Sequence, residues 1–388
     1  MRSRLPDATF TGLGGLAMER AGQHRVVHAE DVAHMGLTEV IRHAPYIYSQ
    51  YRRLVHSIRC QRPDVAILID FPDVNFRLAK HLRRAGVPVL WFVSPQLWAW
   101  KRRRLRWVQQ RVDRMLVIFP FEAPFYQARG VAAEFVGHPL AQLPPPQISR
   151  EEFVARSMSK GSAAPDRSLH MQRPWVALLP GSRWKEVTAN LPTMLQGAAL
   201  LGPGYDFLIP IASTLDQDRF SNLLFHQLLP RIEWPASSIT LVPDARAAMY
   251  FARASVVASG TATVQALTIG NPFIVVYRVS KLSFALLKRL VRYPLEIPAE
   301  PDEAGNLPVG MVNLVAGKRI VPELLNDRFT AENVAAALRP LLEDTPERAR
   351  MLTDLNEGRA RLSGEDPIGR VCTVVEELLA SRQGMKAT

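Results

Sequence analysis

The stretch from Trp175 to Glu186 joins a short apolar run to a glycine turn and the start of a helix. The run Val176–Leu179 has the length and the bounds of a buried parallel strand. Because the first N–H groups of a helix have no partner inside the helix, the turn Pro180-Gly181-Ser182 can bind an anion. Arg183 adds a guanidinium group that suits phosphate oxygens. An ordinary strand-to-helix turn of an α/β protein would show the same residues.

Apolar runs of this kind recur along the chain and alternate with helical segments. We expect a short strand within Pro6–Gly15 that runs into a glycine turn. Further strands are expected at 65–69, 87–93, 115–119, 133–136, 176–179, 206–211, 239–242, 255–258 and 273–277. Such alternation predicts right-handed parallel β-α-β units with helices on the sheet faces. The chain is therefore predicted to be an α/β protein with two consecutive Rossmann-like, doubly wound domains. Ligands of these sheets bind at the carboxyl ends of strands, which is where Asp70 and Ser94 would lie.

A change of composition marks the expected domain boundary. Residues 142–173 contain Pro144-Pro145-Pro146 and then Ser, Lys, Gly and Ala without strong periodicity, which is typical of a linker. We therefore place a first domain at 1–141, a linker at 142–173 and a second domain at 174–345. The mostly helical segment 346–388 is expected to pack back on the first domain.

Composition limits the class of protein. The 388 residues include two cysteines, show no apolar run of 18 residues and begin without the apolar core of a signal peptide, so we expect a cytoplasmic protein. The net charge of +12 is concentrated at 101–114 and 281–292, where basic residues alternate with aromatic and aliphatic ones. This pattern fits an anionic membrane surface, a nucleic acid or an anionic substrate, or simply a solvated basic face.

Candidate catalytic groups are few. Asp70 follows a predicted strand and could act as a general base, whereas Asp73 is the better candidate for capping the next helix. His138 could carry a proton or contact a phosphate, but a lone histidine is more often structural. The loop Ser259–Thr263 is a second small-residue turn before a helix, which strengthens the prediction of a nucleotide site. No Cys/His cluster has metal-ligand spacing, and no Walker, Gly-x-Ser-x-Gly or Gly-x-Gly-x-x-Gly motif is present.

Several longer motifs occur in a fixed order. They are Ile69–Asn75, Val93–Trp100, Phe119–Glu122, Phe135–Pro139, Leu178–Glu186, Ala258–Ala262, Lys288–Leu290, Asn313–Gly317 and Val321–Leu325. Together they resemble the lipid-A-disaccharide synthases, which are glycosyltransferases of the GT-B type with two Rossmann-like domains facing a cleft. The resemblance covers most of the chain, from about Pro6 to the last helices.

The resemblance implies a reaction and a location. UDP-2,3-diacylglucosamine would be joined to 2,3-diacylglucosamine 1-phosphate with inversion, releasing UDP and giving the lipid A disaccharide, without a metal or other cofactor. The expected partners are these acylated substrates and the cytoplasmic face of the inner membrane, to which the protein would bind peripherally; no nucleic acid is expected. The resemblance also suggests a homodimer that exchanges C-terminal segments. Two alternatives are another UDP-sugar transferase or epimerase of the same fold, and a catalytically silent homologue that binds membranes.

The resemblance also assigns roles to residues. Asp70 would be the general base on the acceptor hydroxyl, and Arg183 would stabilise the leaving diphosphate. The residues expected to line the UDP-sugar pocket are Gly181, Ser182, Arg183, Glu186, Gly260, Thr261, Thr263, Gln265 and Asn313. Those expected to contact the membrane or acyl chains are Trp98, Trp100, Arg102, Arg103 and Trp107.

The chain departs from the family pattern at two places. The family begins with a strand and a Gly-Glu-Ala-Ser-Gly-Asp loop, and no such segment precedes Pro6, so the first domain is expected to lack its first strand. Gln265 stands where the family has a glutamate that would pair with the ribose hydroxyls. An amide still forms hydrogen bonds there but without the strength that a charge adds.

Overall fold

The computed structural model describes residues 1–29, 31, 44–158, 173–235, 237–279, 293–297, 299–302 and 305–387. The chain divides into two compact units, one formed by Met1–Gly137 with Gly364–Thr388 and the other by His138–Ser363. The sequence analysis placed these boundaries after residues 141 and 345. The basic segment 281–292 and residues 159–172 of the predicted linker lie outside the described residues.

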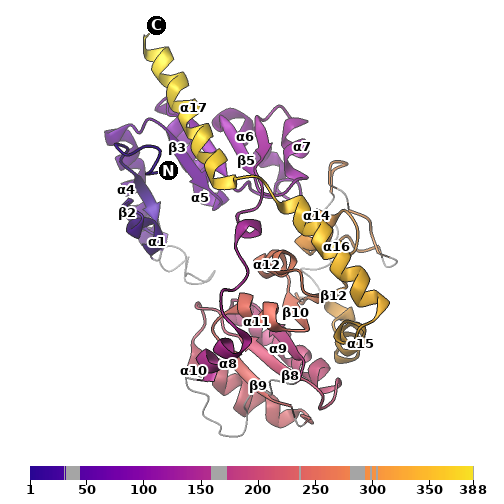
Figure 1. Cartoon of the computed structure of the whole chain (residues 1–388). Helices are drawn as coiled ribbons and strands as arrows, with labels where there is room; N and C mark the ends of the chain where they lie inside the picture. Colours follow the sequence, from indigo (N-terminus) through magenta and orange to yellow (C-terminus); the bar gives the residue numbers. More distant parts are fainter. Residues whose placement is uncertain are drawn as a thin grey trace. The chain divides into compact units, whose positions relative to one another are not determined.

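The second unit is built on a six-stranded parallel sheet (Figure 1). Its strands are β7 (Trp175–Leu179), β8 (Asp206–Pro210), β9 (Ile239–Val242), β10 (Ala254–Ala258), β11 (Phe273–Tyr277) and β12 (Glu323–Leu325). They lie in the order β12-β11-β10-β7-β8-β9, so the chain adds strands on one side of β7 and then returns to add the rest on the other. This is the doubly wound order of a dinucleotide-binding fold, as the sequence predicts.

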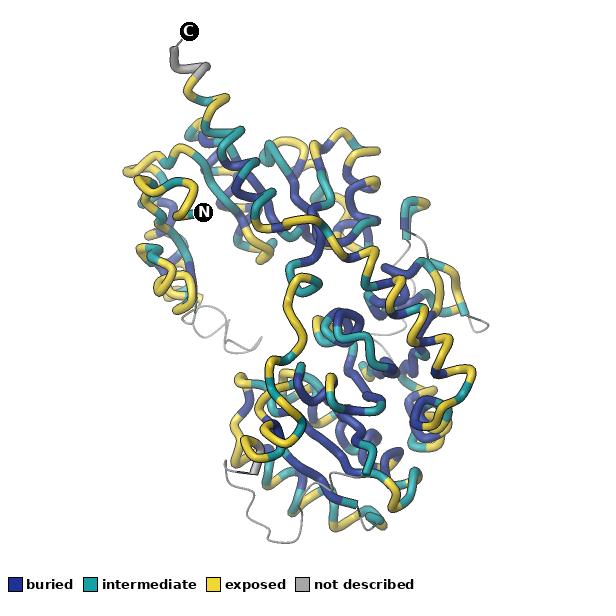
Figure 2. Tube along the Cα trace, in the orientation of Figure 1, coloured by how far each residue is buried: buried dark blue, intermediate teal, exposed yellow. Residues whose placement is uncertain are grey.

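Helices cover both faces of this sheet. They are α8 (Arg150–Met158), α9 (Trp184–Ala199), α10 (Gln217–Asn222), α11 (Ala245–Phe251), α12 (Thr261–Ile269), α14 (Met311–Ala316), α15 (Ala331–Leu342) and α16 (Pro346–Leu362). The strands are mostly apolar, as expected for a sheet covered on both faces, and Figure 2 shows them as the buried centre of the unit. Gly197 lets α9 and α15 approach closely, since a Cβ there would lie 2.6 Å from the Cβ of Val334.

The first unit contains two parallel sheets. Its main sheet has the order β3 (Ala66–Ile69), β4 (Val89–Phe92), β5 (Arg114–Val117), β6 (Ala133–Phe135). A separate pair consists of β1 (Thr11–Gly14) and β2 (His24–His28), and β2 was not predicted. The helices are α1 (Leu16–Arg20), α4 (Ala44–Gln61), α5 (Pro72–Arg84), α6 (Leu105–Arg111) and α7 (Glu122–Gln127). The parallel strands joined by helices confirm the predicted α/β class.

The last helix, α17 (Pro367–Ala387), belongs to the first unit, whereas α16 packs on α12 and α14 of the second unit. The Arg370 guanidinium in α17 donates to both carboxylate oxygens of Glu134 in β6, at 2.6 and 2.9 Å. It also pairs with Glu377, which in turn pairs with Arg114 in β5. This chain of alternating charges fixes α17 along the sheet.

The two segments that lead from one unit to the other run side by side. In the first unit the backbone of Gly364 lies against that of Gly137, and a Cβ at Gly364 would be 2.1 Å from the carbonyl oxygen of Val136. In the second unit the backbone N–H of His138 donates to the carbonyl oxygen of Leu362 at 2.8 Å. Glycine is therefore required at 364 by close backbone contact.

Candidate functional site

The two glycine turns of the second unit leave neighbouring strands at the same edge of the sheet. Strands β7 and β10 are paired with Leu179 opposite Val257, so the turn Pro180–Arg183 and the turn Ser259–Thr261 follow side by side. This is the point where the strand order reverses, and ligands of doubly wound sheets bind in the crevice there. Gly260 has a φ of +148° and open space where a Cβ would point, so its backbone is accessible to a ligand.

The Pro180–Arg183 turn is held from beneath by side chains that come from other parts of the unit. The Asn190 amide in α9 donates to the carbonyl oxygen of Pro180 at 2.9 Å, and the Thr214 hydroxyl donates to that of Ser182 at 2.7 Å. The Arg183 side chain is 82% exposed, so its guanidinium projects from a fixed turn into solvent. Such a turn is organised before a ligand arrives.

Glu186 lies over this turn. Its carboxylate accepts a hydrogen bond from the backbone N–H of Ser182 at 3.0 Å and pairs with the Arg183 guanidinium at 3.1 Å. A Cβ on Gly181, whose φ is +127°, would lie 2.6 Å from the same carboxylate. Glycine at 181 and the acid at 186 therefore form one closely packed corner at the amino end of α9.

The second glycine turn is supported by Thr263, which the sequence placed in the pocket lining. Thr263 is fully buried, and its hydroxyl donates to the carbonyl oxygen of Gly260 at 2.8 Å. That prediction is corrected, because the hydroxyl stabilises the turn and does not face outward. Thr261 is exposed beside Gly260, and Gln265 is half-buried one turn further along α12.

Asn313 was also expected in the pocket lining, and the structure corrects this. Its side chain is fully buried in α14, and its Oδ1 accepts hydrogen bonds from the backbone N–H groups of Ile320 and Val321. Its amide donates to the Glu323 carboxylate at 2.8 Å and to the carbonyl oxygen of Val321. The Glu323 carboxylate in turn accepts from the backbone N–H of Gly310. Asn313 thus has no hydrogen-bonding capacity left for a ligand and instead fixes the segments around α14.

In the first unit, Asp70 lies exposed at the carboxyl end of β3 in a strained stretch of backbone. Asp70 and Phe71 have φ values of +43° and +44°, and Val93 at the end of β4 has a φ of +64°. Left-handed backbone is costly for residues other than glycine, above all for a β-branched valine. The backbone N–H of Asp70 donates to the carbonyl oxygen of Phe92, so these strained positions lie at neighbouring strand ends. Strain of this kind concentrates at functional sites.

Asn75 holds the strained turn in place. This buried residue in the first turns of α5 donates through Nδ2 to the carbonyl oxygens of Asp70, at 2.7 Å, and Ile69, at 3.2 Å. Residue-level reasoning missed this role, although Asn75 closes one of the motifs on which the family resemblance rests.

Asp73 does not cap the helix, contrary to the prediction. Phe71 is the N-cap of α5 and Pro72 is its first residue, so Asp73 falls in the first turn. There its carboxylate accepts a hydrogen bond from Arg104 at 2.6 Å. This hydrogen bond holds the pKa of Asp73 below its ordinary value.

Trp98 is buried and not available for lipid contact, so its predicted role at the membrane is corrected. It is 1% exposed, and its Nε1 donates to the carboxylate of Glu122 at 3.1 Å. Glu122 is itself buried and also accepts from the Ser94 hydroxyl, at 2.9 Å. Burial raises the pKa of Glu122 to about 7, although these hydrogen bonds oppose the rise.

The remaining residues of the basic segment differ in exposure. Trp100 is 52% exposed, with the Lys101 ammonium 4.2 Å from its ring centroid, and Arg102 and Arg103 are exposed beside it. Trp107 is half-buried, because its ring packs at 5.5 Å against that of Phe76. A basic surface with one projecting indole therefore follows β4.

His138 has a structural environment. It is buried, and its Nδ1 accepts a hydrogen bond from the backbone N–H of Leu140 at 3.1 Å, which caps the short 3-10 turn Pro139–Gln142. Burial lowers the pKa of His138 to about 4. The imidazole is therefore neutral at physiological pH and serves as a cap, the structural alternative left open by the sequence.

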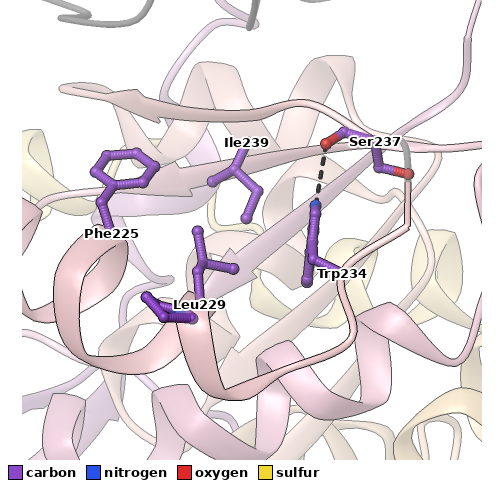
Figure 3. Close-up of a pocket in the computed structure, with 6 residues that line it drawn as sticks. Phe225, Leu229, Trp234, Ser237 and Ile239 are labelled. Atoms are coloured by element: carbon purple, nitrogen blue, oxygen red, sulfur yellow. Dashed lines mark hydrogen bonds between the residues drawn. The ribbon is translucent and has the colours of Figure 1, made fainter.

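A small cavity of about 260 Å³ lies elsewhere in the second unit (Figure 3). It is lined by Phe225, Leu229, Pro230, Trp234, Ser237 and Ile239. Ser237 and Ile239 are at the amino end of β9, the edge strand, whereas both glycine turns follow the carboxyl ends of strands. This cavity is thus separate from the candidate nucleotide site.

Two features are absent from the described part of the chain. No helix there has the length and apolar character needed to cross a bilayer. Within the same residues, no three or more His, Cys, Asp or Glu side chains are grouped so that they could ligate a metal ion.

The sequence matches the family model for lipid-A-disaccharide synthetase over residues 1–365. The lipid-A-disaccharide synthase of Acidobacterium capsulatum is 48% identical over 395 residues, covering 99% of this chain and 92% of its own. That of Koribacter versatilis is 45% identical over 363 residues, covering 93% and 87%.

Solved structures share the fold at low sequence identity. The calicheamicin glycosyltransferase CalG4 superposes with a TM-score of 0.56 at 14% identity, covering 97% of this chain and 92% of that one. The S. aureus MnaA–UDP co-structure gives 0.57 at 10% identity, covering 96% and 97%. The doubly wound sheet, its paired glycine turns and these neighbours define a GT-B fold with two Rossmann-like domains. The chain belongs to the lipid-A-disaccharide synthase family and is a glycosyltransferase of lipid A biosynthesis.

Proposed function

We propose that this chain transfers a diacylglucosamine unit from UDP-2,3-diacylglucosamine to 2,3-diacylglucosamine 1-phosphate, with inversion at the anomeric carbon. The observation that carries the proposal is the position of the two glycine turns, side by side at the β7/β10 switch point of a family member. The names of its relatives give the product class as a lipid A disaccharide. A nucleotide-activated sugar is the donor that such a switch point accommodates.

The donor diphosphate would bind at the Pro180–Arg183 turn. The amino end of α9 supplies backbone N–H groups and the positive end of a helix dipole, and the exposed Arg183 guanidinium supplies a fork of donors. Negative charge grows on the leaving UDP as the glycosidic bond breaks. These fixed positive groups would stabilise that charge more strongly in the transition state than in the ground state.

Asp70 would be the general base. In an inverting transfer one carboxylate removes the proton from the attacking hydroxyl while the leaving group departs from the opposite face of the sugar. Asp70 is exposed at a strand end, and its backbone is held by Asn75 against its own conformational preference. A base fixed in this way supports attack with little loss of orientation.

Both proposed substrates carry acyl chains, so the reaction would take place at the cytoplasmic face of the inner membrane. The exposed surface formed by Trp100, Lys101, Arg102 and Arg103 would supply peripheral contact, since an indole suits the headgroup layer and the cations suit anionic lipids. This assignment excludes the buried Trp98. Trp107, half-buried against Phe76, would contribute only its outer edge.

The test is an assay of disaccharide formation from purified substrates in mixed micelles, with the anomeric configuration of the product determined by NMR. A β-linked disaccharide together with stoichiometric UDP is the expected result. Release of UDP or a changed sugar without a disaccharide would favour another UDP-sugar transferase or epimerase. Micelle binding without any turnover by folded protein would favour a catalytically silent homologue.

A further inference from the structure

The loop after β4 begins next to Asp70. Because the backbone N–H of Asp70 donates to the carbonyl oxygen of Phe92, the last residue of β4, the loop Ser94–Trp98 leaves the sheet at the neighbouring strand end. The strained Val93 turns the chain between the strand and the loop, and its carbonyl oxygen accepts from the Trp91 indole at 3.1 Å. The loop therefore borders the position proposed for the acceptor hydroxyl.

One buried carboxylate holds both ends of this loop. Oε1 of Glu122 accepts from the Ser94 hydroxyl at 2.9 Å and from the Trp98 indole at 3.1 Å, and Oε2 accepts from the backbone N–H of Phe119. All three donors and the carboxylate are buried. Burying a charge is costly unless hydrogen bonds compensate it, and these three hydrogen bonds supply that compensation.

The middle of the loop is fixed as well. The buried Tyr126 hydroxyl donates to the carbonyl oxygen of Pro95 at 2.6 Å. The carbonyl oxygen of Gln96 accepts from the backbone N–H groups of Ala99 and Trp100. Gln96 itself is exposed, whereas Ser94, Pro95, Leu97 and Trp98 are all buried. The side chain of Gln96 is thus exposed on a loop whose other residues are buried.

We propose that the Gln96 amide hydrogen-bonds the acceptor sugar, and that Glu122 is the positioning residue that fixes the Ser94–Trp98 loop for this contact. A primary amide can donate and accept at once, which matches the hydroxyl groups of a sugar ring. The inference rests on the proposed function, because it takes Asp70 as the base that faces the acceptor. Glu122 acts only through the loop and does not touch the substrate.

The experiment compares Gln96→Ala, Glu122→Gln and the double variant with the wild-type chain. Steady-state rates are measured with varied acceptor at saturating donor, and acceptor binding is measured directly by calorimetry in the same micelles. Gln96→Ala is expected to raise the KM and the Kd for the acceptor about tenfold, the effect of one lost hydrogen bond. The affinity for UDP and the thermal midpoint should stay near their wild-type values.

The double variant separates positioning from general stability. Glu122→Gln should raise the acceptor KM in the wild-type background and add little in the Gln96→Ala background, because both changes remove the same contact. Where Glu122→Gln does not fold, Ser94→Ala removes one anchor of the loop and takes its place in the cycle. Matched controls are Gln110→Ala, an exposed glutamine on α6, and Asp206→Asn, a buried acid at the amino end of β8. Neither should change the acceptor KM.

Several outcomes would overturn the inference. An unchanged acceptor Kd in Gln96→Ala would show that Gln96 does not contact the acceptor. If the fold-changes of the two single variants multiply in the double variant, Glu122 does not act through Gln96. Both comparisons are also made with the acceptor Kd from calorimetry, which does not depend on turnover. A wild-type chain that binds the acceptor but forms no disaccharide refutes the proposed function, while the Gln96 comparison of binding still decides the inference. A wild-type chain that does not bind the acceptor refutes both.

Discussion

The side-chain amide of Asn75 donates to the main-chain carbonyl of Asp70, so a buried residue in α5 controls the backbone beneath an exposed carboxylate at the end of β3. The same amide also binds the carbonyl oxygen of Ile69. Together these two hydrogen bonds compensate for the left-handed conformation of Asp70 and Phe71. The position of Asp70 is thus set by the backbone and by Asn75.

Asn75→Ala should lower kcat by about tenfold to a hundredfold, because the carboxylate of Asp70 loses its fixed position. Stability should fall by ~1–3 kcal/mol from two lost hydrogen bonds. Both are measured, by the disaccharide assay and by urea unfolding. The matched control is Asn271→Ala, which removes an amide that donates to the carbonyl oxygens of Met249, Tyr250 and Ala252 in the second unit. If that variant lost kcat to the same degree, the effect of Asn75 would be one of stability alone.

Asp70→Asn should reduce kcat by roughly a hundredfold or more, since the amide cannot accept the proton of the attacking hydroxyl. The affinity for UDP, measured by calorimetry, should be unchanged, because Asp70 belongs to the first unit and both glycine turns to the second. The neighbouring Asp73→Asn weakens only the ion pair with Arg104 and should leave turnover near wild type. A parallel loss of UDP affinity in Asp70→Asn would contradict its role as base.

Arg183→Ala should weaken UDP binding tenfold to a hundredfold, the effect of losing ~1.5–3 kcal/mol of charge-assisted hydrogen bonding. Transfer should also slow, because the leaving diphosphate loses a donor. Arg183→Lys keeps the charge without the planar fork, so its affinity for UDP should lie between those of the wild type and Arg183→Ala. The control Lys185→Ala makes the same change of charge at an exposed neighbour in α9. Equal effects of Arg183→Ala and Lys185→Ala would show that only net charge matters.

Glu122 predicts a pH dependence of stability. Its pKa is raised from the ordinary 4.5 to about 7 by burial, so between these values the folded chain retains a proton that the unfolded chain has lost. The free energy of unfolding should therefore fall as pH rises through this window, by up to ~1.4 kcal/mol per pH unit, and level off above about 7. Urea unfolding of wild type and Glu122→Gln at pH 5, 6, 7 and 8 isolates this component. A difference between the two proteins that is constant with pH would refute it.

The exposed basic surface predicts membrane contact. Trp100→Ala with Arg103→Ala should reduce binding to vesicles containing phosphatidylglycerol about tenfold or more, given ~1 kcal/mol for each cation near an anionic surface. Flotation of the protein with the vesicles measures this. Tyr250→Ala with Arg59→Ala removes one exposed aromatic ring and one exposed cation elsewhere and serves as the control. Equal binding by the two variants would argue against a localised contact surface.

Much of the fold could be predicted because its strands are buried on both faces. A continuous apolar run such as Phe273–Tyr277 signals a parallel strand without any partner being known. Strand β2 was missed, since His24, Arg25 and His28 interrupt its apolar pattern. Strand β12 was also missed. It has only three residues and includes Glu323, whose burial depends on hydrogen-bond donors in a different segment.

The positions of the turns in the candidate site could be predicted from the sequence, but the orientations of several side chains could not. Gly181, Gly260 and Asp70 were placed correctly at strand ends, because turns interrupt the apolar pattern at those points. Trp98, Thr263 and Asn313 were expected to face a ligand or the membrane and are buried. Their orientation is decided by hydrogen-bond partners such as Glu122, and a partner 24 residues away along the chain leaves no local signal.

The discontinuous first unit has a consequence for synthesis. Glu134 meets Arg370 only after the whole of His138–Ser363 has been translated. At typical elongation rates this interval is on the order of ten seconds or more, which is long enough for the second unit to fold first. During that time α17 has not yet been synthesised, so the sheet of the first unit exposes the surface that this helix later covers. The first unit is therefore completed last, although its sheet is synthesised first.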